Sequence, residues 1–187
     1  MFELETCDVL LFVNESKGWT QDISRWGIGK YGHAAMYVGF ADFGSHYTPF
    51  LFESTGRGCA LHSLYHHFGE LLLVMRPQVD LESKQWLIDN AIDLSNDPKA
   101  YYDYFTIAKS CIPRVLKAKL PFPFNLLIPV KYQRDPMMIC SEAVAECFWR
   151  AGLEVLPEDV VPLPGDFEES PILQSMYTGR LLNDIQP

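Results

Sequence analysis

Three residues of this chain have side chains that could cooperate in nucleophilic catalysis, and they lie far apart in the sequence: His33, Glu53 and Cys140. A cysteine attacks as its thiolate, an imidazole takes and returns the proton, and a carboxylate orients the imidazole. These roles depend on adjacency in space and not on the order along the chain. The sequence therefore offers a base, an orienting group and a nucleophile on separate elements.

Each of the three also has a purely structural interpretation. Cys140 stands at or near the start of an amphipathic pattern, where a helix N-terminus favours the thiolate. A helix that begins at Asp135-Pro136 would instead bury Cys140 one turn inside, as a core thiol. His33, beside Gly32 and two alanines, can simply fill a strand edge. Glu53 follows the apolar run 50–52, and because a buried glutamate needs a partner, a neighbouring strand carrying His33 would supply one.

A second group of ionisable side chains is the histidine cluster His62, His66 and His67. His62 and His66 have the i,i+4 spacing of a metal-binding pair on a helix. The glutamate that follows the first histidine of an HExxH site is absent, because Ser63 stands there. Metal sites need further ligands, and none is evident nearby in the sequence. The pattern favours a solvated or edge-packed cluster over a metal site.

Composition bounds the class of protein. The 187 residues, 48% of them hydrophobic, are enough for a single domain over 1–187 with a substantial core. The net charge of −9 argues against a general nucleic-acid binder, because affinity for phosphate backbones comes from clustered lysine and arginine. The start of the chain lacks a signal-peptide pattern and no stretch is long enough to span a membrane, so we expect a cytoplasmic protein. The cysteines form no CxxC pair, and those other than Cys140 are expected to be buried thiols: Cys7, Cys59, Cys111 and Cys147.

The hydrophobic pattern predicts mostly strands in the first half of the chain and helices in the second. Strands are expected over 8–13, 33–40, 49–54, 58–61 and 70–76, and helical segments over 19–30, 81–95, 104–120, 140–153 and 168–177. Strands followed by helices, without βαβ alternation, indicate an α+β fold with a mainly antiparallel sheet or barrel packed against helices.

A basic, proline-rich excursion over 112–136 precedes the cysteine helix. It combines Lys117, Lys119 and other cations with several phenylalanine and leucine side chains. Such a segment is either an ordinary solvated loop or a site for a ligand with an apolar part and a negative group. In the second case we expect peripheral contact with anionic lipid, and the sequence leaves the oligomeric state open.

Six short motifs occur together in one order, and in that order they resemble a known family. They are Asp8–Phe12, Tyr31–Ala34, Phe52–Ser54, Tyr102–Phe105, Ile139–Glu142 and Pro164–Asp166. Together they are similar to the circularly permuted, YiiX-like branch of the NlpC-type papain-fold hydrolases, in which the cysteine helix follows the histidine strand. The motifs span nearly the whole chain.

The resemblance implies a papain-like fold of permuted topology, with Cys140 as nucleophile, His33 as base and Glu53 as the residue that orients His33. It implies a cysteine hydrolase of peptidase or amidase type that uses no metal or cofactor. The substrate would be a peptide, a peptidoglycan fragment or a lipid-linked acyl compound. Separately from the resemblance, we expect Tyr31, Tyr102, Lys117 and Lys119 to contact it. Acyl transfer through the same thioester, and a catalytically silent ligand- or lipid-binding module, are the alternatives.

Overall fold

The computed structural model describes residues 1–15, 29–44, 46–101, 113, 117 and 138–187. Within them, one antiparallel sheet has the strand order β5-β4-β3-β2-β6-β7, and two short strands, β1 and β8, pair in parallel. The strands are β1 (Phe2–Glu3), β2 (Val9–Val13), β3 (Tyr31–Asp42), β4 (Tyr47–Thr55), β5 (Gly58–Ser63), β6 (Leu71–Pro77), β7 (Leu173–Arg180) and β8 (Ile185–Gln186). The helices are α2 (Leu81–Asn96) and α5 (Cys140–Arg150), with 3₁₀ turns η1 (Leu64–His67) and η4 (Pro164–Glu169). The predicted α+β class with an antiparallel sheet is confirmed.

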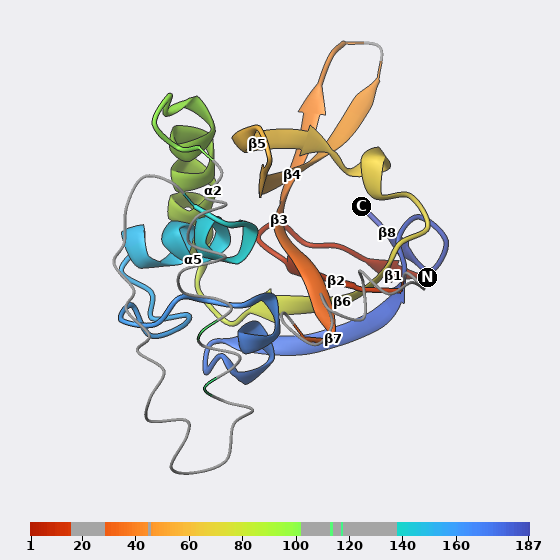
Figure 1. Ribbon diagram of the computed structural model, residues 1–187. Coiled ribbons are helices and arrows are strands. Elements are labelled where there is room, and N and C mark those ends of the chain that lie inside the picture. The colour runs from red at the N-terminus through yellow and green to blue at the C-terminus, as the bar shows by residue number, and fades with distance from the viewer. Residues whose placement is uncertain (16–28, 45, 102–112, 114–116, 118–137) are drawn as a thin grey trace.

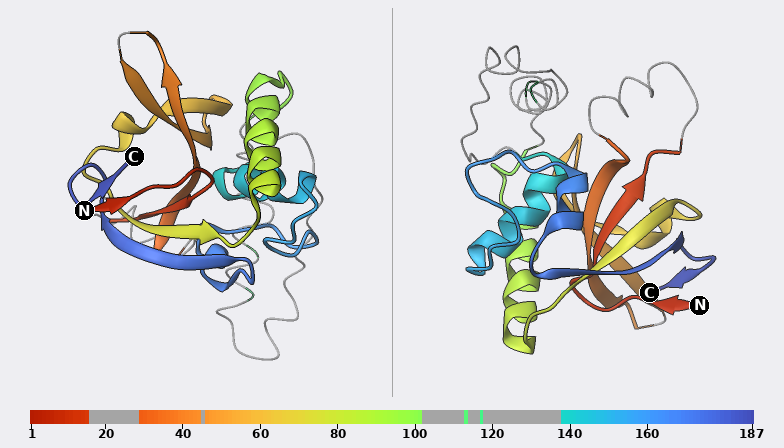
Figure 2. Two further views of the ribbon diagram at one scale, coloured as in Figure 1. Left: turned by 180° about the vertical axis from the view of Figure 1, so that it is seen from behind. Right: turned by 90° about the horizontal axis from the view of Figure 1, so that it is seen from below.

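The two helices lie side by side on one side of the sheet, as Figures 1 and 2 show. Helix α2 begins where the Asp80 carboxylate accepts a hydrogen bond from the Ser83 backbone N–H at 2.8 Å. Its buried residues Leu87, Ala91 and Leu94 recur at helical spacing and face the core. The Asn90 side chain donates to the Cys147 carbonyl at 3.0 Å and joins α2 to α5. Helix α5 also packs against strands β3 and β4 of the sheet.

The two faces of the sheet bury separate hydrophobic clusters. One lies between the sheet and the helices and includes Leu11, Met36 and Phe148. The other lies on the opposite face, toward η1 and the β1–β8 pair, and includes Phe12 and Leu64. Leu11 and Phe12 are neighbours in β2, so the alternation of side chains along the strand assigns them to different faces. The sheet is therefore covered on both sides.

The helical segment predicted over 168–177 is wrong. Part of it belongs to η4, and strand β7 then pairs antiparallel with β6 from Leu71↔Arg180 to Pro77↔Leu173. The β6 edge offers backbone donors and acceptors along its length, and pairing with them outweighs a weak helical spacing in the segment. Predicted segments 19–30 and 104–120 lie almost wholly outside the described residues.

The described helices include none that is long and apolar enough to cross a membrane. The thiols of Cys7, Cys59 and Cys147 are free and buried, as predicted. Cys111 lies outside the described residues.

Gly58, at the turn from β4 to β5, is a position where we expect substitution to be costly. Its φ is +101°, and a Cβ there would lie 2.6 Å from the Ala100 carbonyl oxygen, which already accepts a hydrogen bond from Cys59 N–H at 3.0 Å. Gly58→Ala should lower the free energy of unfolding by about 3 kcal/mol, from backbone strain plus the clash. Urea unfolding followed by circular dichroism measures this loss.

The matched control is Gly152→Ala, because Gly152 also has a positive φ (+72°) but nothing within 4 Å of its added Cβ. This variant should lose only about 1 kcal/mol, the cost of the backbone conformation alone. Equal losses in the two variants would show that the Ala100 carbonyl moves aside at no cost.

Candidate active site

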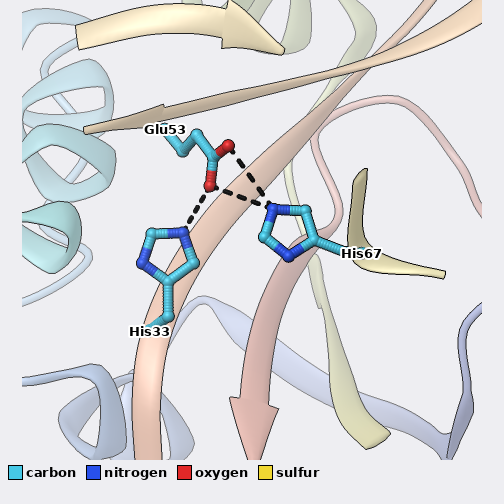
Figure 3. Close-up of side chains that lie close together, drawn as sticks. All are labelled: His33, Glu53 and His67. Atoms are coloured by element: carbon cyan, nitrogen blue, oxygen red, sulfur yellow. Dashed lines mark hydrogen bonds and ion pairs between the residues drawn. The ribbon is translucent and has the colours of Figure 1, made fainter. Parts of the chain in front are cut away.

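His33 and Glu53 lie on neighbouring strands and contact each other directly. Met36 of β3 pairs with Phe52 of β4, and by the alternation of side chains this register places His33 and Glu53 on the same face. The distance from His33 Nε2 to Glu53 Oε2 is 2.5 Å. Figure 3 shows the carboxylate pointing at the imidazole. Glu53 is only 3% exposed, so its charge depends on partners such as His33.

Cys140 is the first residue of α5, and the start of this helix is tied to the strand that carries Glu53. Ser54, the residue after Glu53, donates its hydroxyl hydrogen to the Met138 carbonyl at 2.7 Å. The Ser141 hydroxyl donates to the Pro162 carbonyl at 2.8 Å, which fixes the helix start from the other side. Cys140 thus stands in the first turn of α5 and not one turn inside a longer helix.

The surroundings of Cys140 stabilise its thiolate. Burial disfavours the charged form, but the positive charge of His33 and a hydrogen bond from its ring outweigh burial and lower the pKa of the Cys140 thiol. Backbone N–H groups of Ala34 and Ser141 act in the same direction. By contrast, burial raises the pKa of Cys7 to about 12 and that of Cys59 to about 11. Cys140 therefore differs from the structural thiols in its electrostatics.

The imidazole of His33 lies between a thiol and a carboxylate. Burial alone would lower the pKa of His33, but Cys140 and Glu53 together raise it to about 10. Burial would likewise raise the pKa of Glu53, yet hydrogen bonds from His33 and His67 hold it well below its usual range. Because Nε2 contacts Glu53, the remaining ring nitrogen, Nδ1, is the one available to the thiol. The arrangement is a thiolate–imidazolium pair held by a carboxylate.

Two further histidines contact the same carboxylate, and sequence reasoning missed both. His62 Nδ1 lies 2.8 Å from Glu53 Oε1. His67 Nε2 lies 3.3 Å from Oε2 and 3.4 Å from Oε1. The signal for His62 was available: in β5, paired with β4, it has the same parity as Ala60, which lies opposite Glu53. His67 gave no such signal, because it lies beyond the strand in η1.

His62 lies on the edge strand β5 and is partly exposed, as expected for an edge-packed cluster, but the prediction did not include the contacts of His62 and His67 with Glu53. The i,i+4 reasoning does not apply, because η1 begins only at Leu64 and His62 belongs to β5. The fully buried Leu64 fixes η1 against the sheet, and the chain then turns His67 toward Glu53. The exposed His66 keeps its ring 6.2 Å from that of His62. The sequence did not reveal the partners of His62 and His67, which are Glu53 of β4 for both and the His33 ring of β3 for His67.

The residues expected to contact substrate lie in different surroundings. The Tyr31 ring is buried, and its hydroxyl donates to Glu168 at 2.8 Å, which links β3 to η4. Lys117 is exposed. Tyr102 and Lys119 lie outside the described residues, as does nearly all of the excursion 112–136. Contact of these four residues with substrate, and of the excursion with anionic lipid, stays a prediction.

Comparison with models of known protein families and with curated protein sequences found no match. Among solved structures, the chain is similar to the crystal structure of the metalloprotein yiiX from Escherichia coli O157:H7, a DUF1105 protein. The TM-score is 0.62 at 15% sequence identity, and the match covers 94% of this chain and 98% of that one. The chain therefore has the fold of yiiX over almost its whole length.

Proposed function

We propose that the protein is a cysteine hydrolase of the peptidase or amidase type, which cleaves an amide or related acyl bond through a thioester on Cys140. The observation that carries the proposal is the position of the His33 ring between the Cys140 thiol and the Glu53 carboxylate. The lowered pKa of the Cys140 thiol supports it, because the thiolate is the nucleophile. The similarity in fold to yiiX agrees with the family resemblance of the motifs.

The reaction follows from the geometry. The Cys140 thiolate attacks the carbonyl carbon of the substrate. Cys140 is the first residue of α5, and the first backbone N–H groups of a helix have no partner within the helix, so they can donate to the oxyanion that forms. His33 then gives its proton to the leaving amine, and the acyl group stays on sulfur as a thioester. Next, His33 takes a proton from a water molecule, which attacks the thioester and releases the acid. Glu53 keeps the ring oriented through both proton transfers.

A metal ion is a separate question, because the structural neighbour is described as a metalloprotein. The donor atoms of His33, Glu53 and His67 lie within 4.8 Å of one another, and imidazole nitrogens with a carboxylate are ligands that Zn²⁺ binds. The residues thus fit a metal ion in kind. The proposed hydrolysis uses them differently: His33 is held in direct contact with Glu53 and serves the thiol.

The thiolate–imidazolium pair predicts an unusual pH profile for alkylation of Cys140. With EDTA present, the rate of reaction with iodoacetamide should change little between pH 8.5 and 7, because the thiolate persists below the ordinary thiol pKa of ~8.5. In His33→Gln the thiol loses its cationic partner, and the rate should fall about tenfold for each pH unit below that value. Mass spectrometry of tryptic peptides measures the rate at each cysteine.

Two internal standards make this measurement specific. Cys7 and Cys59, whose pKa values are raised, should remain unreacted at pH 7 in both proteins. The comparison uses the shape of each pH profile, so the limited access to Cys140, which is 6% exposed, does not affect it. Identical profiles in the wild type and His33→Gln would contradict the ion pair and, with it, the proposed nucleophile.

A further inference from the structure

Three histidines around one buried carboxylate are more than a cysteine hydrolase needs. Proposed catalysis uses His33 and Glu53, while His67 and His62 contact Glu53 without a place in the proton transfers. His33 Nε2, His67 Nε2 and a Glu53 carboxylate oxygen face one another in Figure 3. Two imidazole nitrogens and a carboxylate oxygen are the ligands of a common class of zinc site with one open position.

The donor atoms lie within 4.8 Å of one another, so a small metal ion fits after limited adjustment of the side chains. Zn²⁺ binds nitrogen and oxygen at about 2.0–2.2 Å, so tetrahedral ligand atoms are roughly 3.3 Å apart. His67 Nε2 is already 3.3 Å from Glu53 Oε2. The contact between His33 Nε2 and Oε2, at 2.5 Å, is a direct hydrogen bond and has to widen by under about 1 Å. Rotation of the carboxylate or of the His33 ring supplies a movement of this size.

A second, independent observation is the outer partner of His67. A metal-binding histidine commonly donates its other ring N–H to a carboxylate, which fixes the ring and strengthens it as a ligand. His67 Nδ1 lies 3.2 Å from Glu70 Oε1, while Nε2 faces Glu53. His62 similarly hydrogen-bonds Glu53 Oε1 and holds the carboxylate. The two ring nitrogens of His67 thus face two different carboxylates, Glu53 and Glu70, which is the arrangement of a metal-binding histidine and not of one that only fills space.

We propose that His33, Glu53 and His67 bind one divalent transition-metal ion, Zn²⁺ as the test ion, with Glu70 and His62 orienting the ligands. This differs from the expectation of a metal-free site. Zn²⁺ and the hydrogen bond to Glu53 compete for the same atom, Nε2 of His33, so the metal-bound site and the hydrogen-bonded pair of the proposed hydrolysis are two different states of the same side chains.

The test measures binding of Zn²⁺ itself to the full chain, in competition with a chromophoric chelator and without substrate. The wild type should bind one equivalent. His67→Gln should weaken binding at least about 100-fold, and Glu70→Gln about 10- to 100-fold, as outer partners of metal ligands do. The matched control is His66→Gln, an exposed residue in the same 3₁₀ turn, which should bind like the wild type. No binding, or equal affinity in His66→Gln and His67→Gln, would overturn the proposal.

The variant Cys140→Ala distinguishes Zn²⁺ bound at the proposed site from Zn²⁺ bound to the Cys140 thiol. It should retain one equivalent of Zn²⁺, whereas loss of binding in this variant would place the ion on Cys140 and overturn the site. Because this test reads metal binding and not turnover, failure of the hydrolase proposal and failure of the zinc site give different results.

Discussion

Replacing Cys140 with alanine should reduce hydrolysis of any substrate that the wild type cleaves by at least about 10⁴-fold. Removal of a nucleophile that forms a covalent intermediate has effects of this order, because no other group takes its place. The measurement is kcat/KM for a panel of peptide anilides and acyl esters, followed by single-turnover mass spectrometry. In the wild type, the latter should find an acyl adduct on Cys140.

The control is Cys147→Ala, since Cys147 is fully buried on the same helix and has a raised pKa. It should retain activity and lose stability from the cavity it leaves. Glu53→Gln should give an intermediate loss, because it keeps the shape of the side chain but removes the charge beside His33. Retention of wild-type rates in Cys140→Ala would refute the proposed nucleophile, and transfer of the acyl group to an added amine would favour the acyltransferase alternative.

Arg76→Met should lower the free energy of unfolding by about 3 kcal/mol, because it removes one partner of a buried ion pair. The Arg76 guanidinium donates from Nε to Asp8 Oδ1 at 2.9 Å and from Nη2 to Oδ2 at 2.8 Å. Asp8 is fully buried, so methionine would leave an uncompensated carboxylate inside the protein. Removal of one partner from a buried ion pair usually costs about 3–5 kcal/mol. We expect the lower value because the Arg76 side chain is 14% exposed.

Arg150→Met is the control for this prediction. Arg150 pairs with Glu146 at 2.8 Å on the exposed side of α5, where an ion pair contributes no more than about 0.5 kcal/mol. Guanidinium chloride masks charge, so urea is the suitable denaturant for both variants. A loss under 1 kcal/mol in Arg76→Met would mean that solvent reaches Asp8 in the native state.

The central strands and both long helices could be predicted from hydrophobic pattern because each buries a regular face. Leu87, Ala91 and Leu94 recur as a helix requires, and α2 was predicted to within one residue of its bounds. Cys140 at a helix start and Glu53 at the end of an apolar strand were visible for the same reason. The roles of these residues in catalysis stay a proposal.

The remaining features depend on contacts between distant parts of the chain. Strand β7 forms because β6 offers it an edge, and nothing within residues 173–180 announces that edge. His67 reaches Glu53 because the 3₁₀ turn after β5 reverses the chain around Leu64. A local pattern of histidines cannot show which of them turns inward. The structure was needed to find that Glu53 is shared by His33, His62 and His67.

The pairing of β1 with β8 brings the two ends of the chain to the same side of the molecule, as Figure 1 shows. Phe2 N–H donates to the Asp184 carbonyl and Leu4 N–H to the Gln186 carbonyl, both at 2.8 Å. Because these strands are parallel, a linker from Pro187 to Met1 has to run back along the short pair, which only a linker of several residues can do. Joining the ends would reduce the conformational entropy of the unfolded chain far more than that of the folded one. For a loop of this length the free energy of unfolding should rise by about 5 kcal/mol.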